Sequence, residues 1–221
     1  MNKLPISNNY IYEFELNQDL VDVSLEKILS KNIKYNSTVP NAAKWGYFTD
    51  TGIDEIPIYE KDLFDEIQKC VDLVCDLHFT DSKLVICDSW LTKVNFGQGT
   101  NLHYHSFSIF SGLLYFGNCN TSKTTFEIED TFYKRYEILF EPKLKKQKVK
   151  LDYAPQKGKL LIWDSTILHK ISTHKERDIR YSLAFNTWLS GQISDFATAR
   201  LKSDAADIGS QFNSTYRTKN I

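Results

Sequence analysis

Three histidines are the side chains of this sequence best suited to chemistry. His103 and His105 are separated by one residue beside strand-like sequence, and His169 comes much later, after the apolar run Leu160–Trp163. On an extended backbone, residues i and i+2 point to the same side, so both imidazoles of the pair can face one ion. Neutral imidazoles suit Fe, Zn, Cu and Ni, and three protein ligands leave positions open for water, substrate or O2. The pattern predicts a metal site, and its alternative is a pair of polar residues at a strand edge.

Arg180, on the next expected strand after His169, could bind a carboxylate beside such a metal. A guanidinium offers a planar fork that matches a carboxylate. Ser182 lies two residues on, hence on the same face, and its hydroxyl can donate to the same group. Such an Arg would hold the far end of a dicarboxylic acid whose near end chelates the ion. Taken alone, an Arg in a strand is more often a surface residue or an ion-pair partner.

The elements that must position these groups change type along the chain. Apolar residues recur every three or four positions from Lys61 to His78, which predicts an amphipathic helix, and a shorter helix is expected over Asn17 to Ser30. The Pro- and Gly-containing stretch 38–58 is typical of an irregular connection. Short apolar or alternating runs predict strands at Tyr10–Leu16, Leu84–Cys87, Trp90–Phe96, Phe107–Phe116, Thr124–Ile128, Tyr136–Phe140, Val149–Tyr153, Leu160–Trp163, Leu168–Ser172 and Arg180–Trp188.

This order of elements favours a mainly β fold with flanking helices, a sandwich or open barrel with the helices packed outside. We expect a single domain over 1–221, with 1–80 as a helical and irregular support, 84–190 as the β core and 191–221 as a C-terminal tail. The tail could be a lid, a dimer arm or a frayed end, so a homodimer is among the expectations. The basic run 143–150 is expected to be a solvated edge strand, with an anionic partner as its alternative.

Composition argues against several classes of function. The 221 residues contain 27 basic and 28 acidic side chains, for a net charge of -1, which gives no electrostatic footprint for nucleic acid or an anionic membrane. No apolar run approaches the roughly 20 residues that span a bilayer, and the N-terminus lacks the apolar stretch of a secretion signal. The four cysteines show no CxxC spacing, which indicates reduced, buried thiols and a cytoplasmic location.

The order of these motifs resembles that of the 2-oxoglutarate- and iron(II)-dependent oxygenases. The local sequence is most similar to that of a subgroup of bacterial and phage proteins. In these, SGxxY follows HxH, apolar residues precede the distal His, and SxxFNxW follows the Arg. This chain has His103-Tyr-His105, Ser111-Gly-Leu-Leu-Tyr115, Ile167-Leu-His169 and Arg180-Tyr-Ser-Leu-Ala-Phe-Asn-Thr-Trp188. The resemblance covers about Trp90 to Trp188. It implies a double-stranded β-helix (the cupin-like jelly roll), with Fe(II), the cosubstrate 2-oxoglutarate and O2 as cofactors.

The resemblance also implies roles for individual residues. His103 and His169 would be the two family histidine ligands, and Arg180 with Ser182 would hold the distal carboxylate of 2-oxoglutarate. Tyr115 and Asn95 match positions that often line the cosubstrate pocket; the alternatives are a core aromatic for Tyr115 and a turn-stabilising side chain for Asn95. The implied reaction hydroxylates an unactivated C–H bond of a peptidyl or small-molecule substrate and releases succinate and CO2.

His105 departs from the family pattern, which has Asp or Glu there. A carboxylate would lower the charge of the site, whereas an imidazole leaves the full 2+, and a dianionic cosubstrate could balance it. Whether His105 is the third ligand, or Asp164 or water replaces it, stays open at this stage. Asp164 is expected to have a turn role or to orient a ligand histidine. His78 and His174 are expected to be solvent-facing or capping, and Trp90, Trp163 and Trp188 frame a pocket or pack the core.

Two rival functions remain. A cupin-like three-histidine dioxygenase or isomerase needs no cosubstrate, so an Arg180→Ala variant would keep its activity. A non-catalytic jelly-roll binding module would take up no stoichiometric iron.

Overall fold

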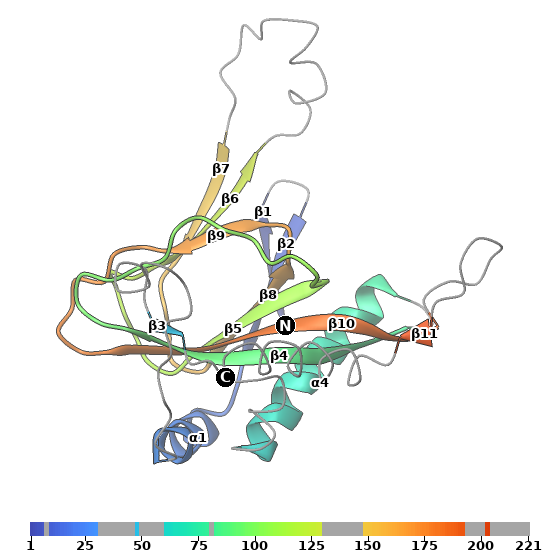
Figure 1. Ribbon diagram of the computed structural model, residues 1–221, viewed down its shortest axis with the longest axis horizontal. Helices are drawn as coiled ribbons and strands as arrows, with labels where there is room; N and C mark the ends of the chain where they lie inside the picture. The colour runs from blue at the N-terminus through green and yellow to red at the C-terminus, as the bar shows by residue number, and fades with distance from the viewer. Residues whose placement is uncertain are drawn as a thin grey trace, which may run out of the picture.

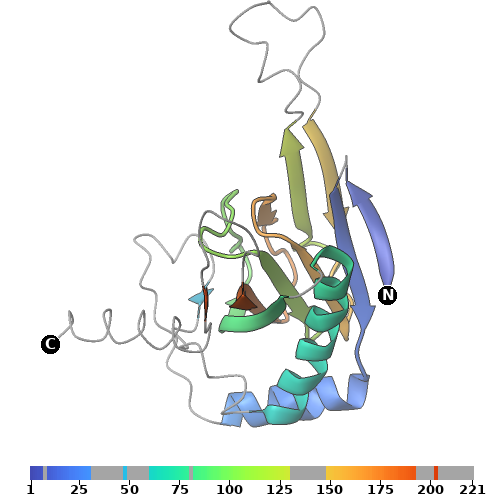
Figure 2. The ribbon, with the colours of Figure 1, turned by 90° about the vertical axis from the view of Figure 1, so that its right-hand side faces the viewer.

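Two sheets and two helices position the histidine cluster. The computed structural model describes residues 1–6, 9–30, 47–48, 60–79, 82–129, 148–192 and 202–203. Within them, an eight-stranded sheet has both helices on one face and a three-stranded sheet across from the other (Figure 1). Figure 2 shows the helices and the strand pair β6 and β7 at opposite ends of the molecule.

The bounds of the elements are as follows. The helices are α1 (Gln18–Ser30) and α4 (Lys61–His78). The large sheet contains β1 (Asn2–Ile6), β2 (Asn9–Glu15), β8 (Lys159–Asp164), β5 (Phe110–Tyr115), β10 (Arg180–Gln192), β4 (Lys83–Val94) and β3 (Tyr47–Phe48) in this spatial order, with β11 (Lys202–Ser203) paired to β10. The small sheet has the order β7 (Lys148–Tyr153), β6 (Thr124–Glu129) and β9 (Leu168–Ile171).

The strand order is that of a double-stranded β-helix, in which strands far apart in sequence lie side by side. In the large sheet β10 lies between β5 and β4, and β5 also pairs with β8, all antiparallel. In the small sheet β6 lies between β7 and β9. An isolated antiparallel bridge between His103 and His169 adds the segment before β5 to the free edge of β9. The predicted jelly roll with flanking helices is confirmed.

The two helices cover the outer face of the large sheet because each has an apolar stripe. In α4, Leu63, Ile67, Val71 and Val74 recur at helical spacing and are buried, while the opposite side of the helix is exposed. Helix α1 begins where the side chain of Asn17 accepts hydrogen bonds from the backbone N–H groups of the first turn, at 2.8 and 3.2 Å.

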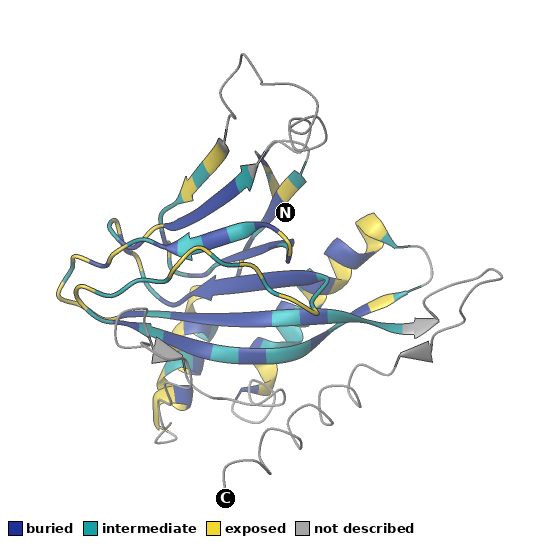
Figure 3. Ribbon diagram, turned by 45° about the horizontal axis from the view of Figure 1, so that its top comes forward, coloured by how far each residue is buried: buried dark blue, intermediate teal, exposed yellow. Residues whose placement is uncertain are grey.

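Both faces of the central strands are buried, which explains why their sequences are continuously apolar rather than alternating. On β8, Leu160 and Ile162 pack toward the helices, while Leu161 and Trp163 pack into the core between the sheets. Figure 3 shows the same burial along the middle of β4, β5 and β10. The even-numbered residues of β10 from Arg180 onward therefore face the small sheet.

Most strand predictions agree with the structure, and two elements differ. The two strands expected at Leu84–Cys87 and Trp90–Phe96 are one strand, β4, because its pairing with β10 continues across a register shift at residues 186 and 187. Strand β1 was not predicted. The lysine-containing β7 is an edge strand, as expected from the sequence. The predictions for Tyr136–Phe140, for nearly all of 38–58 and for the helical stripe of the tail lie outside the described residues.

Candidate metal and cosubstrate site

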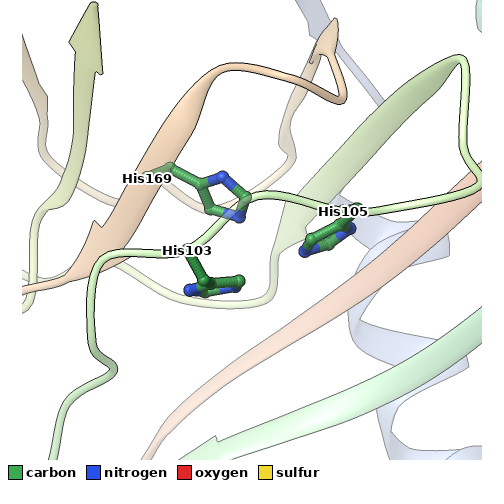
Figure 4. Close-up of side chains that lie close together, drawn as sticks. All are labelled: His103, His105 and His169. Carbon is green, nitrogen blue, oxygen red and sulfur yellow. The ribbon is translucent and has the colours of Figure 1, made fainter.

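Three histidine side chains converge where the loop before β5 meets β9. His103, His105 and His169 each offer a ring nitrogen, and these atoms all lie within 4.8 Å of one another (Figure 4). The backbones of His103 and His169 exchange two hydrogen bonds, of 2.9 and 2.8 Å, across the isolated bridge. The backbone N–H of His105 donates to the carbonyl of Ser165 at 3.0 Å. The main chain therefore fixes all three positions.

Each ring has its Nδ1 atom beside an oxygen acceptor. For His103 this is the carbonyl of Asn101 at 2.7 Å, and for His169 it is the carbonyl of Ile167 at 3.0 Å. The Nδ1 of His105 lies 2.6 Å from Oδ1 of Asn186. An Nδ1–H that donates to oxygen leaves Nε2 as the lone pair of the neutral ring, which is the arrangement of metal-binding histidines.

Burial keeps the rings of His105 and His169 neutral. Desolvation lowers the pKa of His105 to about 4, and it lowers the pKa of the buried His169 well below its usual range. A neighbouring imidazole adds to the effect in both cases, because a second positive charge is disfavoured there. The cluster thus has lone pairs available for a cation at neutral pH.

A buried cation lies further along the inner face of β10. Arg180 is only 4% exposed, and its Nη1 atom donates to the hydroxyl of Ser182 at 3.2 Å. Its Nη2 atom is 3.5 Å from Oγ1 of Thr124, and its Nε atom is buried without a hydrogen-bond partner. Among the residues that the structure describes, no carboxylate forms an ion pair with Arg180. An unpaired buried guanidinium is costly, so the arrangement calls for an anionic ligand.

Tyr115 forms the wall of this cationic site. Its ring lies 5.3 Å from the guanidinium carbon of Arg180, and its hydroxyl donates to Thr124 at 2.7 Å. Burial raises the pKa of Tyr115 to about 12, so the hydroxyl stays a donor. Tyr115 is therefore both a core aromatic and a neighbour of the guanidinium, and its contact with a cosubstrate stays a prediction.

Two other residues singled out from the sequence have local roles in turns. Both the backbone N–H and the side-chain amide of Asn95 donate to Oε1 of Gln98, at 2.8 and 3.0 Å. The expected pocket role of Asn95 stays a prediction. Asp164 accepts two hydrogen bonds from Thr166, which is the turn role expected for it.

The remaining histidines and tryptophans are placed as follows. His174 is buried, so the solvent-facing alternative was wrong, and its Nε2 atom lies 2.6 Å from the carbonyl of Asp178, which is compatible with the capping alternative. The Nε2 atom of the half-buried His78 forms a hydrogen bond of 2.6 Å with the hydroxyl of Tyr12. The rings of Trp90 and Trp163 lie 5.5 Å from His105 and 5.0 Å from His169, respectively, at the edge of the histidine cluster.

Three neighbours of the site were not assigned from the sequence. Ser111 and Asn186 stand within the motifs that carry the resemblance, and they are direct cross-strand partners of β5 and β10. Thr124 begins β6 in the other sheet, so only the packing of the two sheets brings it to Arg180. No sequence signal marked Thr124.

Comparisons with known proteins agree with this geometry. A family model described as "Putative 2OG-Fe(II) oxygenase" matches residues 88–186, from β4 to Asn186. No curated protein matches the sequence. Among solved structures, the α-ketoglutarate-dependent epimerase SnoN of nogalamycin biosynthesis is similar, with a TM-score of 0.60 and 11% identity, over 88% of this chain and 91% of that one.

Two prolyl hydroxylases are also similar. The prolyl-4-hydroxylase of Pseudomonas putida has a TM-score of 0.52 and 16% identity, over 81% of this chain and 94% of that one. The viral collagen prolyl hydroxylase of Paramecium Bursaria Chlorella virus-1 has a TM-score of 0.53 and 13% identity, over 82% and 97%. At these identities, the likeness to solved structures establishes the shared fold.

Residues 88–186, which contain the three histidines and Arg180, therefore match the family of 2-oxoglutarate- and Fe(II)-dependent oxygenases, and the solved structures share the fold of the chain. The enzymes of that family use Fe(II), 2-oxoglutarate and O2. None of the described helices is long and apolar enough to cross a membrane.

The residues present fit these cofactors. Three imidazoles suit Fe(II) and leave open coordination positions for the cosubstrate and O2. The buried guanidinium of Arg180 suits a carboxylate, and it contacts Thr124, which lies on β6 two residues before the cross-strand partner of His169.

Proposed function

We propose that His103, His105 and His169 together hold the Fe(II), and that the enzyme hydroxylates an unactivated C–H bond. The observation that carries the proposal is the shared state of the three rings: each has its Nδ1 bound to oxygen, and their ligand atoms converge within 4.8 Å. The third ligand is then an imidazole where the wider family has a carboxylate. When bound, Fe(II) supplies the activation of O2, with oxidation of 2-oxoglutarate to succinate and CO2.

Arg180 binds the distal carboxylate of 2-oxoglutarate in this proposal. Its guanidinium already donates to Ser182 and Thr124, and these contacts hold its plane against the ring of Tyr115. The unpartnered Nε and the absence of an ion-pair partner among the described residues leave its charge available to a ligand. The carboxylate would offset the cost of burying this cation, which makes Arg180 a strong anchor.

The protein also excludes water from the inner end of the site. Tyr115 and Thr124 are fully buried beside the guanidinium, so the hydrogen bonds to the cosubstrate form away from competing solvent. At the other end, the half-buried His103 and His105 leave the histidine cluster accessible to a substrate. The substrate is a peptidyl side chain or a small molecule; two similar folds are prolyl hydroxylases, which supports the peptidyl alternative.

Anaerobic reconstitution tests the proposal. Purified protein loaded with Fe(II) without oxygen should develop a weak visible metal-to-ligand charge-transfer band when 2-oxoglutarate is added. Separate variants His105→Ala and Arg180→Met should lose the band, the first through the metal and the second through the cosubstrate. A full band in His105→Ala would show that the imidazole of His105 is not a ligand. Absence of the band in the wild-type protein despite bound iron would contradict the proposed mode of cosubstrate binding.

The consumption of 2-oxoglutarate by the iron-loaded protein separates the rival activities. A three-histidine dioxygenase without cosubstrate would turn over with no 2-oxoglutarate and would tolerate the Arg180→Met substitution. The buried, unpaired guanidinium argues against this rival, because such an enzyme has no use for an anion site beside its metal.

A further inference from the structure

The hydrogen bond that orients His105 differs in kind from those of the other two histidines. His103 and His169 direct Nδ1 to backbone carbonyls, which any sequence provides. His105 directs Nδ1 to side chains: the amide oxygen of Asn186 lies at 2.6 Å and the hydroxyl of Ser111 at 3.0 Å. Of the three rings, only this one depends for its orientation on the identity of another residue.

An imidazole in this position needs such a partner more than a carboxylate would. A carboxylate has two equivalent oxygens and no tautomers, whereas an imidazole binds a metal through Nε2 only when the proton is on Nδ1. An acceptor at Nδ1 selects that tautomer and fixes the plane of the ring.

We propose that Asn186 is the positioning residue that makes His105 a metal ligand, by accepting the Nδ1 proton of His105 on its amide oxygen. The proposal rests on the proposed function, because it assumes that the three histidines bind the iron. Asn186 acts through His105 and is not itself a ligand in this scheme.

The hydroxyl of Ser111, the cross-strand partner of Asn186, holds the amide in this orientation by donating to the same amide oxygen at 2.9 Å. The oxygen of Ser111 also lies 2.7 Å from the hydroxyl of Ser165, which donates to Ser108 at 2.7 Å. Two donors, Ser111 and His105, thus point at this atom of Asn186, as expected for the amide oxygen, which accepts hydrogen bonds. Ser165 also accepts the backbone N–H of His105, so one network sets both the main chain and the ring of this residue.

The backbone of β10 places Asn186 at this point. The register with β4 shifts between Asn186 and Thr187, an irregularity of the kind that re-aims side chains beside functional sites. Thr187 points to the opposite face, where its hydroxyl donates to the carbonyl of Phe110 at 2.8 Å and accepts the N–H of Phe110 at 3.1 Å. Two adjacent polar residues of one strand therefore serve different sides of the sheet.

Because Asn186 is neutral, His105 stays a neutral ligand. A carboxylate at this place would draw the Nδ1 proton toward itself and make the ring a stronger donor to the metal. The expected order of metal affinity is therefore Asn186→Asp equal to or above the wild type, and Asn186→Leu well below it.

Cobalt titration of the full chain tests the proposal without turnover. Co(II) reports the geometry and number of its ligands in its visible absorption, so its dissociation constant and spectrum are measured for the wild type, Asn186→Leu, Asn186→Asp and Thr187→Val. We expect Asn186→Leu to raise the Co(II) dissociation constant about 10- to 100-fold and to change the spectrum. Asn186→Asp should bind at least as tightly as the wild type. Thr187→Val, which loses two buried hydrogen bonds on the other face, should lower the melting temperature and keep the wild-type affinity.

The outcomes separate the two proposals. Wild-type affinity in Asn186→Leu, or a loss in Asn186→Asp as large as in Asn186→Leu, would overturn the role of Asn186 and leave the three-histidine site intact. An equal loss of affinity in Thr187→Val would show that affinity follows stability alone, which also overturns it. If the wild-type protein binds neither Co(II) nor Fe(II), the proposed function fails and the role of Asn186 fails with it.

Discussion

Replacing Arg180 with methionine should abolish tight binding of 2-oxoglutarate and leave the ligand-free protein close to its original stability. In the described part of the structure the guanidinium has two side-chain hydrogen bonds, to Ser182 and Thr124, and no carboxylate partner. Methionine fills a similar volume without the charge. The two effects of the substitution therefore act on different states of the protein.

The size of each effect follows from these contacts. A bound carboxylate would lose two hydrogen bonds to a charged donor, about 1.5–3 kcal/mol each, which corresponds to a rise in the dissociation constant of about 10²- to 10⁴-fold. In the ligand-free protein, the loss of the bonds to Ser182 and Thr124 costs a similar amount. Removal of a buried, unpaired charge returns several kcal/mol. The two nearly cancel, so the melting temperature should stay within about 4 °C of the wild type.

Calorimetric titration of 2-oxoglutarate into Zn(II)-loaded protein measures the affinity, and thermal unfolding measures the stability. A concentration of 2-oxoglutarate about 100 times the dissociation constant should stabilise the wild type by about 2.7 kcal/mol and leave Arg180→Met unaffected. The matched control is Arg177→Met, an exposed arginine in the loop before β10. If Arg180→Met bound 2-oxoglutarate within threefold of the wild type, the anchor would lie elsewhere. A fall in melting temperature of more than about 10 °C would show that Arg180 is mainly structural.

Three further predictions concern the rest of the molecule. Burial raises the pKa of Cys87 to about 12 and of Cys70 to about 11, so at pH 8 about a thousandth of either thiol or less is ionised. Iodoacetamide should modify both slowly in the native protein and rapidly after denaturation, and equal rates by peptide mass spectrometry would refute this. Gly112 lies under the ring of Phe185, where an added Cβ would be 2.1 Å from Cζ. Gly112→Ala should therefore cost about 1–3 kcal/mol, and an unchanged urea midpoint would contradict the close packing. The lowered pKa values of His105 and His169 mean that the unfolded chain, whose histidines titrate near 6.5, binds more protons than the folded one below that pH. The stability of the metal-free protein should then fall from about pH 6.5 toward pH 4, and flat urea midpoints over this range would refute the assignment of buried neutral rings.

Much of the fold could be predicted because the spacing of apolar residues along the sequence indicates its helices and strands. The apolar residues of Lys61–His78 are compatible with one helix face only, and the structure has α4 over the same residues. The central strands were visible as short apolar runs because helices and the small sheet bury both of their faces. Strand β1 was not visible, because it contains a proline and three of its five side chains, those of Asn2, Lys3 and Pro5, are exposed, which leaves little apolar periodicity. The break expected within β4 was wrong because Asp88 and Ser89 resemble a turn, and only pairing with β10 reveals that the strand continues.

Some residues of the site could likewise be predicted from the sequence, and others could not. The Arg180–Ser182 pair could be predicted because i and i+2 spacing on a strand brings side chains together whatever the remaining fold does. The histidines were recognised by their residue type and spacing, although His103 and His105 lie in the loop before β5. Thr124 and Asn186 reach the site through pairing and packing between distant segments, so their roles depend on the register and on the distance between the sheets. The burial of His174 likewise depends on contacts that its charged sequence neighbours conceal.

The bridge between His103 and His169 has a consequence for how such an enzyme can change. Two of the proposed ligands form one rung of an antiparallel ladder, so main-chain hydrogen bonds set their spacing and the neighbouring side chains do not. Leu102, Tyr104 and Phe107 alternate with or follow the histidines and are 37%, 56% and 86% exposed. Mutational drift at these three positions can remodel the rim of the site while the spacing of the ligands stays constant. Substrate preference can then diverge among descendants faster than the ability to hold iron.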